Sequence, residues 1–294
     1  MTPVQSFPSA LAVLIVAGAM PYAAHGDWTV GAEANVHHDN NVGNAQYASD
    51  IVGDTIIGAR LSTFQLFPIG ENYSVTVAGN LSGESYHRLT GLSNASLEAA
   101  IALKRKWGLG AFVPWARTGV SIARSDYDGS YRNAWVYRAT LASGRRIDER
   151  WNVWADYTFE RRAAGAQMQL APGLSGDAYS QNSHAVGANI EYSLNQNLFL
   201  AVGLVGRRGD VVATTAPNPQ IFYASGALAE DPAFGPNEYA YTLYGTTYGI
   251  RAGIACTPTR HSLLTLEFRR FETRAAGGNN YTKSVPEITW DYSF

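Results

Sequence analysis

The ten residues WNVWADYTFE, from Trp151 to Glu160, carry the pattern that decides the fold. Apolar and polar residues alternate through the stretch, and successive side chains of a β-strand point to opposite faces. The apolar positions are Trp151, Val153, Ala155, Tyr157 and Phe159, and the polar positions between them include Asn152, Asp156, Thr158 and Glu160. The stretch therefore predicts a strand with one apolar face and one polar face.

The same alternation recurs along the chain, with turn-forming residues between the repeats. Eleven further segments carry it, at 28–36, 57–61, 73–81, 97–103, 116–122, 135–141, 186–192, 198–204, 244–254, 264–268 and 288–294. The total of twelve is an even number, as bacterial transmembrane barrels have. We therefore predict an all-β fold, a transmembrane antiparallel up-and-down β-barrel of about 12 strands.

The connections between these segments alternate between short and long. The short ones lie at 69–72, 108–110, 145–149, 195–197 and 257–260, and the long ones at 38–52, 125–133, 164–182 and 208–238. Outer-membrane barrels have short periplasmic turns and longer extracellular loops. We expect both chain ends on the periplasmic side.

Composition agrees with an exported β-protein. Charged residues make up 16% of the chain, whereas a soluble domain usually contains about a quarter. The net charge of −2 argues against a nucleic-acid partner. Cys256 is the sole cysteine, which excludes an internal disulfide, and we interpret it as a small apolar residue late in a strand.

The N-terminus has the pattern of a signal peptide. Residues 10–20 form an apolar run of 11 residues, too short for a spanning helix, and residues 24–26 fit an A-x-A-like cleavage site. Residues 1–9 contain no Lys or Arg, a departure from the usual charged start. We predict a signal peptide at 1–26 and the barrel at 27–294.

The C-terminus has aromatic residues at alternate positions and ends on Phe. With the residue before them, these positions are Ile288, Trp290, Tyr292 and Phe294. They resemble the C-terminal membrane-insertion signal of outer-membrane proteins, which implies the barrel-assembly machinery as a partner, together with outer-membrane lipid and lipopolysaccharide. The alternative is an ordinary edge strand that ends on a buried Phe.

Aromatic residues also gather near the predicted strand ends, where the headgroup region favours their amphipathic rings. One girdle would comprise Trp107, Trp115, Trp151, Tyr192, Trp290 and Tyr292, and the other Trp135, Tyr137, Tyr239, Tyr241 and Tyr281.

Two stretches resemble known barrels. The run HDNNVGNA at 38–45 resembles the opening of barrel domains in exopolysaccharide-export and surface-lipoprotein-assembly proteins, although this chain lacks their preceding helical repeats. The stretch IDERW at 147–151, with 160–162, 209–212 and 233–235, is similar to uncharacterised stand-alone outer-membrane barrels.

The polar face of the strands would line the barrel interior. The predicted pore-lining residues are Arg117, Arg138, Asp156, Glu160, Glu191, Arg207, Arg251, Glu267, Arg269 and Glu287, with Glu98, Lys104 and Asp291 on the same face. Rows of opposite charge could face each other across a water-filled lumen and orient solutes. Alternatively, the charges form satisfied ion-pair networks that fill a narrow interior.

The connection 208–238 is long and contains several apolar residues. Such a loop is rarely free in solvent, so we expect it to fold into the barrel mouth as a constriction or plug. The alternative is a surface loop packed on neighbouring loops or on lipopolysaccharide.

These features predict a passive channel for small hydrophilic solutes or saccharides. A closed barrel that serves as a structural or assembly partner of an envelope export system is the alternative, and a lipid-modifying enzyme is a third class. No His is followed two residues later by Ser, as in outer-membrane phospholipases, and the adjacent His37 and His38 would point to opposite faces. We therefore predict no catalytic residues, metal site or cofactor.

Overall fold

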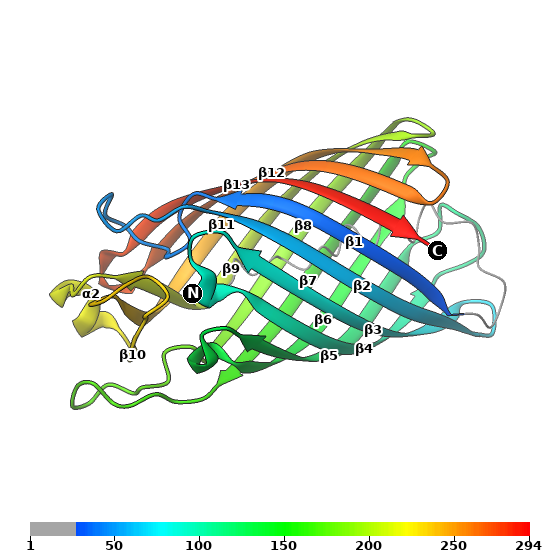
Figure 1. Cartoon of the computed structure of the whole chain (residues 1–294). Helices are drawn as coiled ribbons and strands as arrows, with labels where there is room; N and C mark the ends of the chain where they lie inside the picture. The colour runs from blue at the N-terminus through cyan, green and yellow to red at the C-terminus, as the bar shows by residue number, and fades with distance from the viewer. Residues whose placement is uncertain (1–27) are drawn as a thin grey trace.

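The computed structural model describes residues 28–294, so the predicted signal peptide at 1–26 lies outside the described residues. Twelve of its thirteen strands form one closed antiparallel barrel (Figure 1). They are β1 (Thr29–Asp39), β2 (Asp54–Ile69), β3 (Tyr73–Tyr86), β4 (Asn94–Lys106), β5 (Trp115–Tyr127), β6 (Ala134–Arg146), β7 (Trp151–Ala164), β8 (Gln181–Asn195), β9 (Leu198–Thr215), β11 (Tyr239–Thr259), β12 (Ser262–Ala275) and β13 (Asn280–Ser293). The predicted fold and strand number are confirmed.

Each strand pairs with its neighbour in sequence, and β13 pairs with β1 to close the sheet. The closing register places Glu33 opposite Asp291, and the Phe294 amide donates to the Val30 carbonyl at 3.0 Å. Closure leaves the barrel without a free edge, because every strand has two partners. The strands contain 11 to 21 residues, at least the 9–11 that a tilted spanning strand needs.

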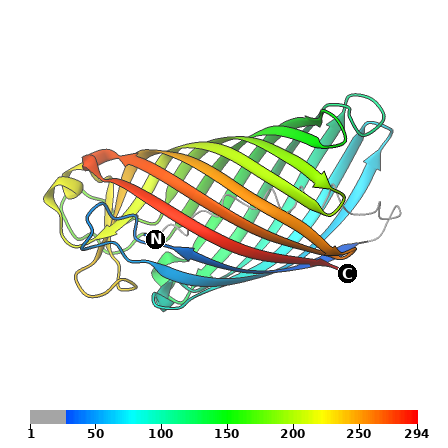
Figure 2. The same ribbon diagram turned by 90° about the horizontal axis from the view of Figure 1, so that it is seen from above.

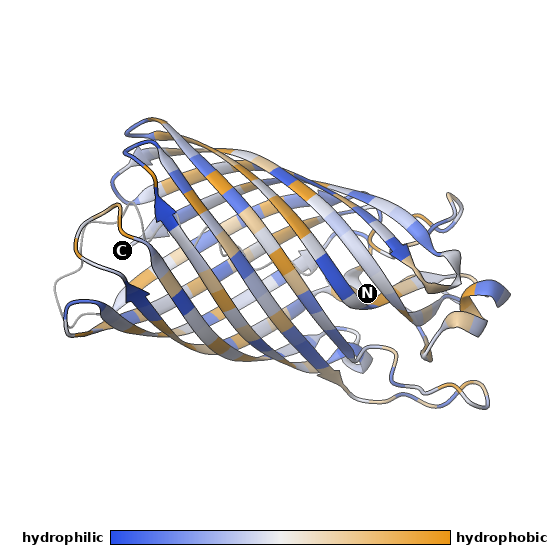
Figure 3. Ribbon diagram, turned by 180° about the vertical axis from the view of Figure 1, so that it is seen from behind, coloured by the Kyte–Doolittle hydropathy of each residue, from blue (hydrophilic) through white to orange (hydrophobic). Residues whose placement is uncertain are grey.

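Hydrophobic and hydrophilic residues alternate along the strands (Figure 3). The apolar side chains of this alternation are exposed on the outer face, and the polar ones lie on the inner face. Ile57, Leu97, Val120 and Val186 point outward with exposed fractions of 57–65%. Apolar side chains exposed all around a barrel indicate a hydrocarbon environment, because a soluble barrel would turn them inward. Within residues 28–294, no helix is long and apolar enough to cross a membrane.

Four residues assigned to the aromatic girdles lie elsewhere. Trp115 and Tyr281 share the inward side of their strands with Arg117 and Lys283, which lie two residues further along. Tyr239 and Tyr241 share the side of β11 that Leu243 occupies, and both pack with Leu243. The girdle prediction was wrong for these four because it used nearness to strand ends and ignored parity. Trp107, Trp151, Trp290, Trp135 and Tyr137 are exposed, as predicted.

At the end where β13 finishes, the connections span 70–72, 107–114, 147–150, 196–197 and 260–261, and the turn predicted at 108–110 is the longest of these (Figure 2). At the opposite end the connections span 40–53, 87–93, 128–133, 165–180, 216–238 and 276–279, and three of these are longer than any at the first end. They contain the helix α2 (Pro219–Ala224), the short strand β10 (Ala227–Glu230) and the 3₁₀ turns η1 (Thr90–Leu92), η2 (Ser130–Arg132) and η3 (Ala276–Gly278). We refer to these connections together as the cap.

The predicted 208–238 loop is shorter than expected. β9 continues to Thr215 and β11 begins at Tyr239, and these two residues pair in register. The connection therefore rises from the barrel as a two-stranded extension, and β10 adds to it by pairing with the first residues of β11.

Candidate channel lumen and extracellular cap

The barrel encloses a cavity of about 1960 Å³ that extends to the turns at the end where β13 finishes. Nine of the ten predicted pore-lining residues line it, namely Arg117, Arg138, Asp156, Glu160, Glu191, Arg251, Glu267, Arg269 and Glu287. Arg207 also occupies an inward position on β9, but it is only 7% exposed and lies outside the cavity lining. Its guanidinium donates to the Asp210 carbonyl at 2.8 Å, so burial in the wall removes it from the lumen surface.

Many of the lumen charges form ion pairs along the wall. Arg138 on β6 contacts Glu160 on β7 at 2.6 Å and Glu98 on β4 at 3.4 Å. Arg269 on β12 contacts Glu267 at 3.4 Å and also pairs with Glu287 on β13. A fifth pair, not predicted from the sequence, joins Arg60 to Glu33 at 3.7 Å. The ion pairs that the sequence analysis gave as the alternative are present, yet they line the cavity and do not fill it.

A second polar chain crosses four strands on another part of the wall. The Asn189 amide donates to Asp156 at 2.9 Å, and Arg251 donates to the Asn189 oxygen at 2.5 Å. Gly187 lies beside Asp156 in register, and Gly203 lies between Asn189 and Arg251. A Cβ at Gly203 would lie 2.5 Å from the Arg251 Nε, so the missing side chain lets this polar chain lie flat against the wall.

Residues that the sequence reasoning missed include Trp154, on the polar face of β7 between Asn152 and Asp156. It is 5% exposed and packs with Ala255 and Leu263. The sequence did contain a signal for it, because Trp154 occupies a position where the strand alternation places polar residues.

The cap closes the end of this cavity that lies opposite the end where β13 finishes. The lining reaches Asn94, Tyr127 and Arg162, and within the described chain it takes no residue from 128–133, 165–180 or 216–238. Val42 and Leu92 are fully buried in the cap, where Phe234 packs against them from the 216–238 connection. Three separate connections thus share one apolar cluster.

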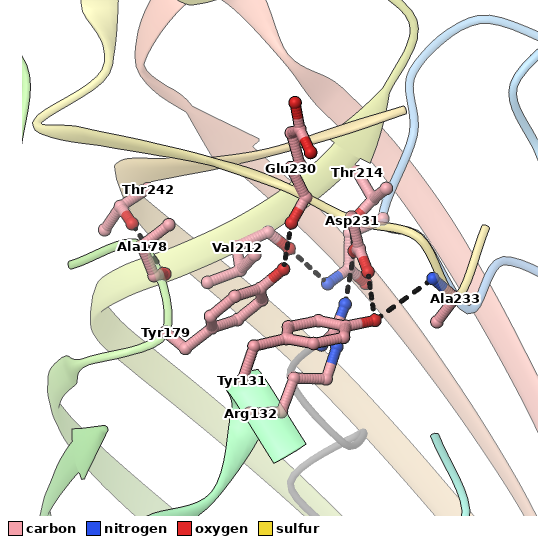
Figure 4. A network of polar contacts seen from close by, with 11 residues as sticks. Tyr131, Arg132, Ala178, Tyr179, Val212, Thr214, Glu230, Asp231, Ala233 and Thr242 are labelled. Carbon is pink, nitrogen blue, oxygen red and sulfur yellow. Dashed lines mark hydrogen bonds and ion pairs between the residues drawn. The ribbon is translucent and has the colours of Figure 1, made fainter. Parts of the chain in front are cut away.

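Asp231 is fully buried in the cap, within a network of polar contacts (Figure 4). Its carboxylate forms an ion pair with Arg132 of η2, and both side chains are 0% exposed. Thr214 donates to the same carboxylate at 2.7 Å, and the Tyr131 hydroxyl donates to it at 3.4 Å. The ion pair joins the 128–133 and 216–238 connections across the barrel mouth.

Two tyrosines complete this network. The Tyr179 hydroxyl donates to the Glu230 carbonyl at 3.0 Å, and its ring lies 4.5 Å from the Arg132 guanidinium carbon. The Tyr131 hydroxyl accepts from the Ala233 amide at 3.0 Å. Burial raises the pKa of both phenols well above the ordinary value, so they remain protonated donors at physiological pH.

The histidines lie where strand parity predicts. His37 points inward and His38 outward. Within residues 28–294, no group of three or more His, Cys, Asp or Glu side chains is placed to hold a metal ion. Cys256 is half-buried near the end of β11.

Comparisons with known proteins show the fold. An outer membrane channel from Pseudomonas putida F1 matches with a TM-score of 0.58 at 12% identity, over 93% of this chain and 98% of that chain. The NanC porin matches with a TM-score of 0.47 at 10% identity, over 89% and 100% of the two chains. The β domain of the Bordetella autotransporter BrkA matches with a TM-score of 0.46 at 10% identity, over 92% and 100%.

No protein-family model matches the chain, and no curated protein matches it. The similarity to exopolysaccharide-export barrels at 38–45 therefore finds no counterpart in these comparisons. The shared fold with the Pseudomonas channel is that of an outer-membrane β-barrel.

Proposed function

We propose that the protein is an outer-membrane channel through which small hydrophilic solutes diffuse passively. One observation carries the proposal: a cavity lined by many charged and polar side chains runs inside a closed barrel whose outer face is apolar. At about 30 Å³ for each water molecule, 1960 Å³ holds roughly 65 waters. A lumen of this size would carry solutes and ions through water.

The cap would act as the gate. The cavity is closed on the extracellular side by connections that hold one another through buried contacts. Conduction then requires the 216–238 connection to move away from 128–133, because the Arg132–Asp231 ion pair bridges the mouth. The closed arrangement is the resting state, and openings are rare and brief.

Single-channel recording in planar bilayers tests this function. The full barrel should show rare conductance steps. A variant in which a four-residue Gly-Ser turn replaces 217–237 should conduct continuously, because Thr215 and Tyr239 already pair and a short turn can join them. Heat-modifiable migration in gels confirms that both proteins are folded. A folded barrel that is silent in both forms would contradict the channel function.

That silent outcome would favour the alternative, a closed barrel that serves as a structural or assembly partner of an envelope export system. The fully buried ion pair of the cap favours this alternative, since a permanently closed barrel would also contain one. The resemblance of 38–45 to export-system barrels supports the same alternative. Co-purification of neighbouring envelope proteins with the intact barrel would then be the deciding measurement.

A further inference from the structure

We propose that the periplasmic half of the lumen binds a small organic anion that carries a carboxylate and a flat apolar ring face. The site comprises Lys104, Lys106, Arg117 and Arg146 beside Trp115. This inference rests on the proposed channel function and names the class of solute that the channel would prefer.

The four cationic residues gather at the turn ends of three adjacent strands. Lys104 and Lys106 end β4, Arg117 lies near the start of β5 and Arg146 ends β6. Lys104 and Arg117 are directly opposite in register. Like charges at opposed positions destabilise a sheet, so an anion bound between them would offset a repulsion present in the empty barrel.

Ion pairing separates this cluster from the rest of the lumen. Arg60, Arg138 and Arg269 each contact a carboxylate within 4.0 Å. Among the described residues, no carboxylate lies within that distance of the four cations of the cluster. Glu191 faces them from two strands beyond Arg146, with Asn152 between in register. The cluster therefore carries net positive charge.

An aromatic wall adjoins the cations. Trp115 and Trp154 flank Gly144, where a Cβ would lie 3.0 Å from the Trp115 ring and 2.5 Å from the Trp154 Cβ. The Lys104 ammonium lies 5.2 Å from the Trp115 ring centroid, in a cation–π arrangement. Glycine at this position makes room for two indoles inside a polar lumen. A ligand with a ring face would contact the wall while its carboxylate contacts the cations.

The chemistry of the wall selects among anions. Inorganic phosphate would satisfy the cations but would leave the indole surface in water. Sugar acids and aromatic carboxylates share the required chemistry, because each has a carboxylate next to a ring with an apolar face. A neutral sugar lacks the charge, and organic cations would be repelled.

The test uses the capped barrel and the variant with 217–237 replaced, in planar bilayers with a KCl gradient. The reversal potential should show preference for chloride. Added glucuronate and benzoate should block the current at concentrations where glucose and phosphate do not. A stronger glucuronate block identifies a sugar acid and a stronger benzoate block an aromatic acid, and either result supports the site.

Lys104→Gln with Arg117→Gln should weaken the block about fivefold for each lost charge. The matched control is Arg105→Gln, which removes one cation from the outward side of the same strand and should leave the block unchanged. Trp115→Leu should weaken the glucuronate and benzoate block while it leaves the chloride preference intact, since it removes the wall and retains the charges.

Conductance without anion preference, or equal effects of the lumen and control variants, overturns this inference and leaves the channel function standing. A folded but silent barrel overturns the proposed function. In that case, quenching of tryptophan fluorescence by titrated benzoate in detergent still tests the site. Saturable quenching that is weakened in Lys104→Gln/Arg117→Gln supports it, and quenching equal to that of Arg105→Gln overturns it.

Discussion

The Asp231→Asn substitution should open the cap. Asp231 and Arg132 are both fully buried, and the carboxylate also accepts a hydrogen bond from Thr214 at 2.7 Å. Asparagine has nearly the same shape but no charge, so it preserves packing and leaves the Arg132 guanidinium buried without a counter-charge. The substitution therefore destabilises the closed cap. It does not destabilise the open form, because Arg132 reaches water there.

Removal of one member of a buried ion pair costs about 3–5 kcal/mol. The lower end applies here, because the introduced asparagine can still accept a hydrogen bond from Arg132. About 3 kcal/mol shifts the equilibrium between closed and open cap by roughly a hundredfold, at a factor of ten for each 1.4 kcal/mol. The apolar contacts of Val42 and Phe234 remain, so the barrel should stay folded.

The assay is the rate of maleimide labelling at Ala233→Cys, in a background where Cys256→Ser removes the native thiol. Ala233 is partly buried in the closed cap, and its amide donates to Tyr131. Labelling should be roughly a hundredfold faster in Asp231→Asn than in the parent, and the open probability in bilayers should rise in parallel.

The matched control replaces both partners, Arg132→Met with Asp231→Leu. An apolar pair of similar volume leaves no buried charge and is often neutral or stabilising, so labelling should stay close to the parent rate. Equal labelling of Asp231→Asn and the parent would refute the role of the Arg132–Asp231 ion pair in keeping the cap closed, as would a double variant that opens as readily as the single one.

Three further predictions concern the lumen, the cap and insertion. Gly203→Val should lower conductance by pushing Arg251 into the lumen, whereas Gly206→Ala, with open space around its Cβ position, should not; bilayer recording compares them. Burial and two neighbouring carboxylates raise the pKa of Glu238 in the cap. A raised folded-state pKa contributes stability that is complete at acidic pH and is lost as the pH rises through that pKa. The labelling rate of the cap cysteine, divided by that of a free thiol at the same pH, should therefore rise from pH 4 toward neutrality, and this rise should be smaller in Glu238→Gln. Deletion of Phe294 should slow insertion into bilayers by the purified assembly machinery, in a folding time course; an unchanged rate would argue against the insertion signal.

The lumen charges show which features of the site local sequence pattern can predict. Arg138, Glu160 and Arg269 could be placed on the inner face because strand parity alone decides which way a side chain points. Their pairing with Glu98 and Glu287 depends on register between strands, which follows from closure of the whole sheet. Trp115 was wrongly assigned to an aromatic girdle, because that assignment used residue type and ignored strand parity.

The contacts of the cap could not be predicted from local sequence pattern. Arg132 and Asp231 are 99 residues apart, and neither has a neighbouring residue that marks it as buried. The sequence indicated an apolar connection at the mouth, but the partners of that connection come from loops whose ends are brought together only by the closed barrel. The same holds for the polar chain over Gly187 and Gly203, whose members come from β7, β8, β9 and β11.

The strand number and the polarity of the two sides of the wall can be predicted from local sequence, because both follow from a period of two along the backbone. Three properties could be seen only in the tertiary structure: the mouth is closed, many lumen charges are paired, and the basic cluster beside Trp115 has no ion pair. Those properties depend on distances between strands and loops far apart in the chain, and such distances exist only once the sheet has closed on itself.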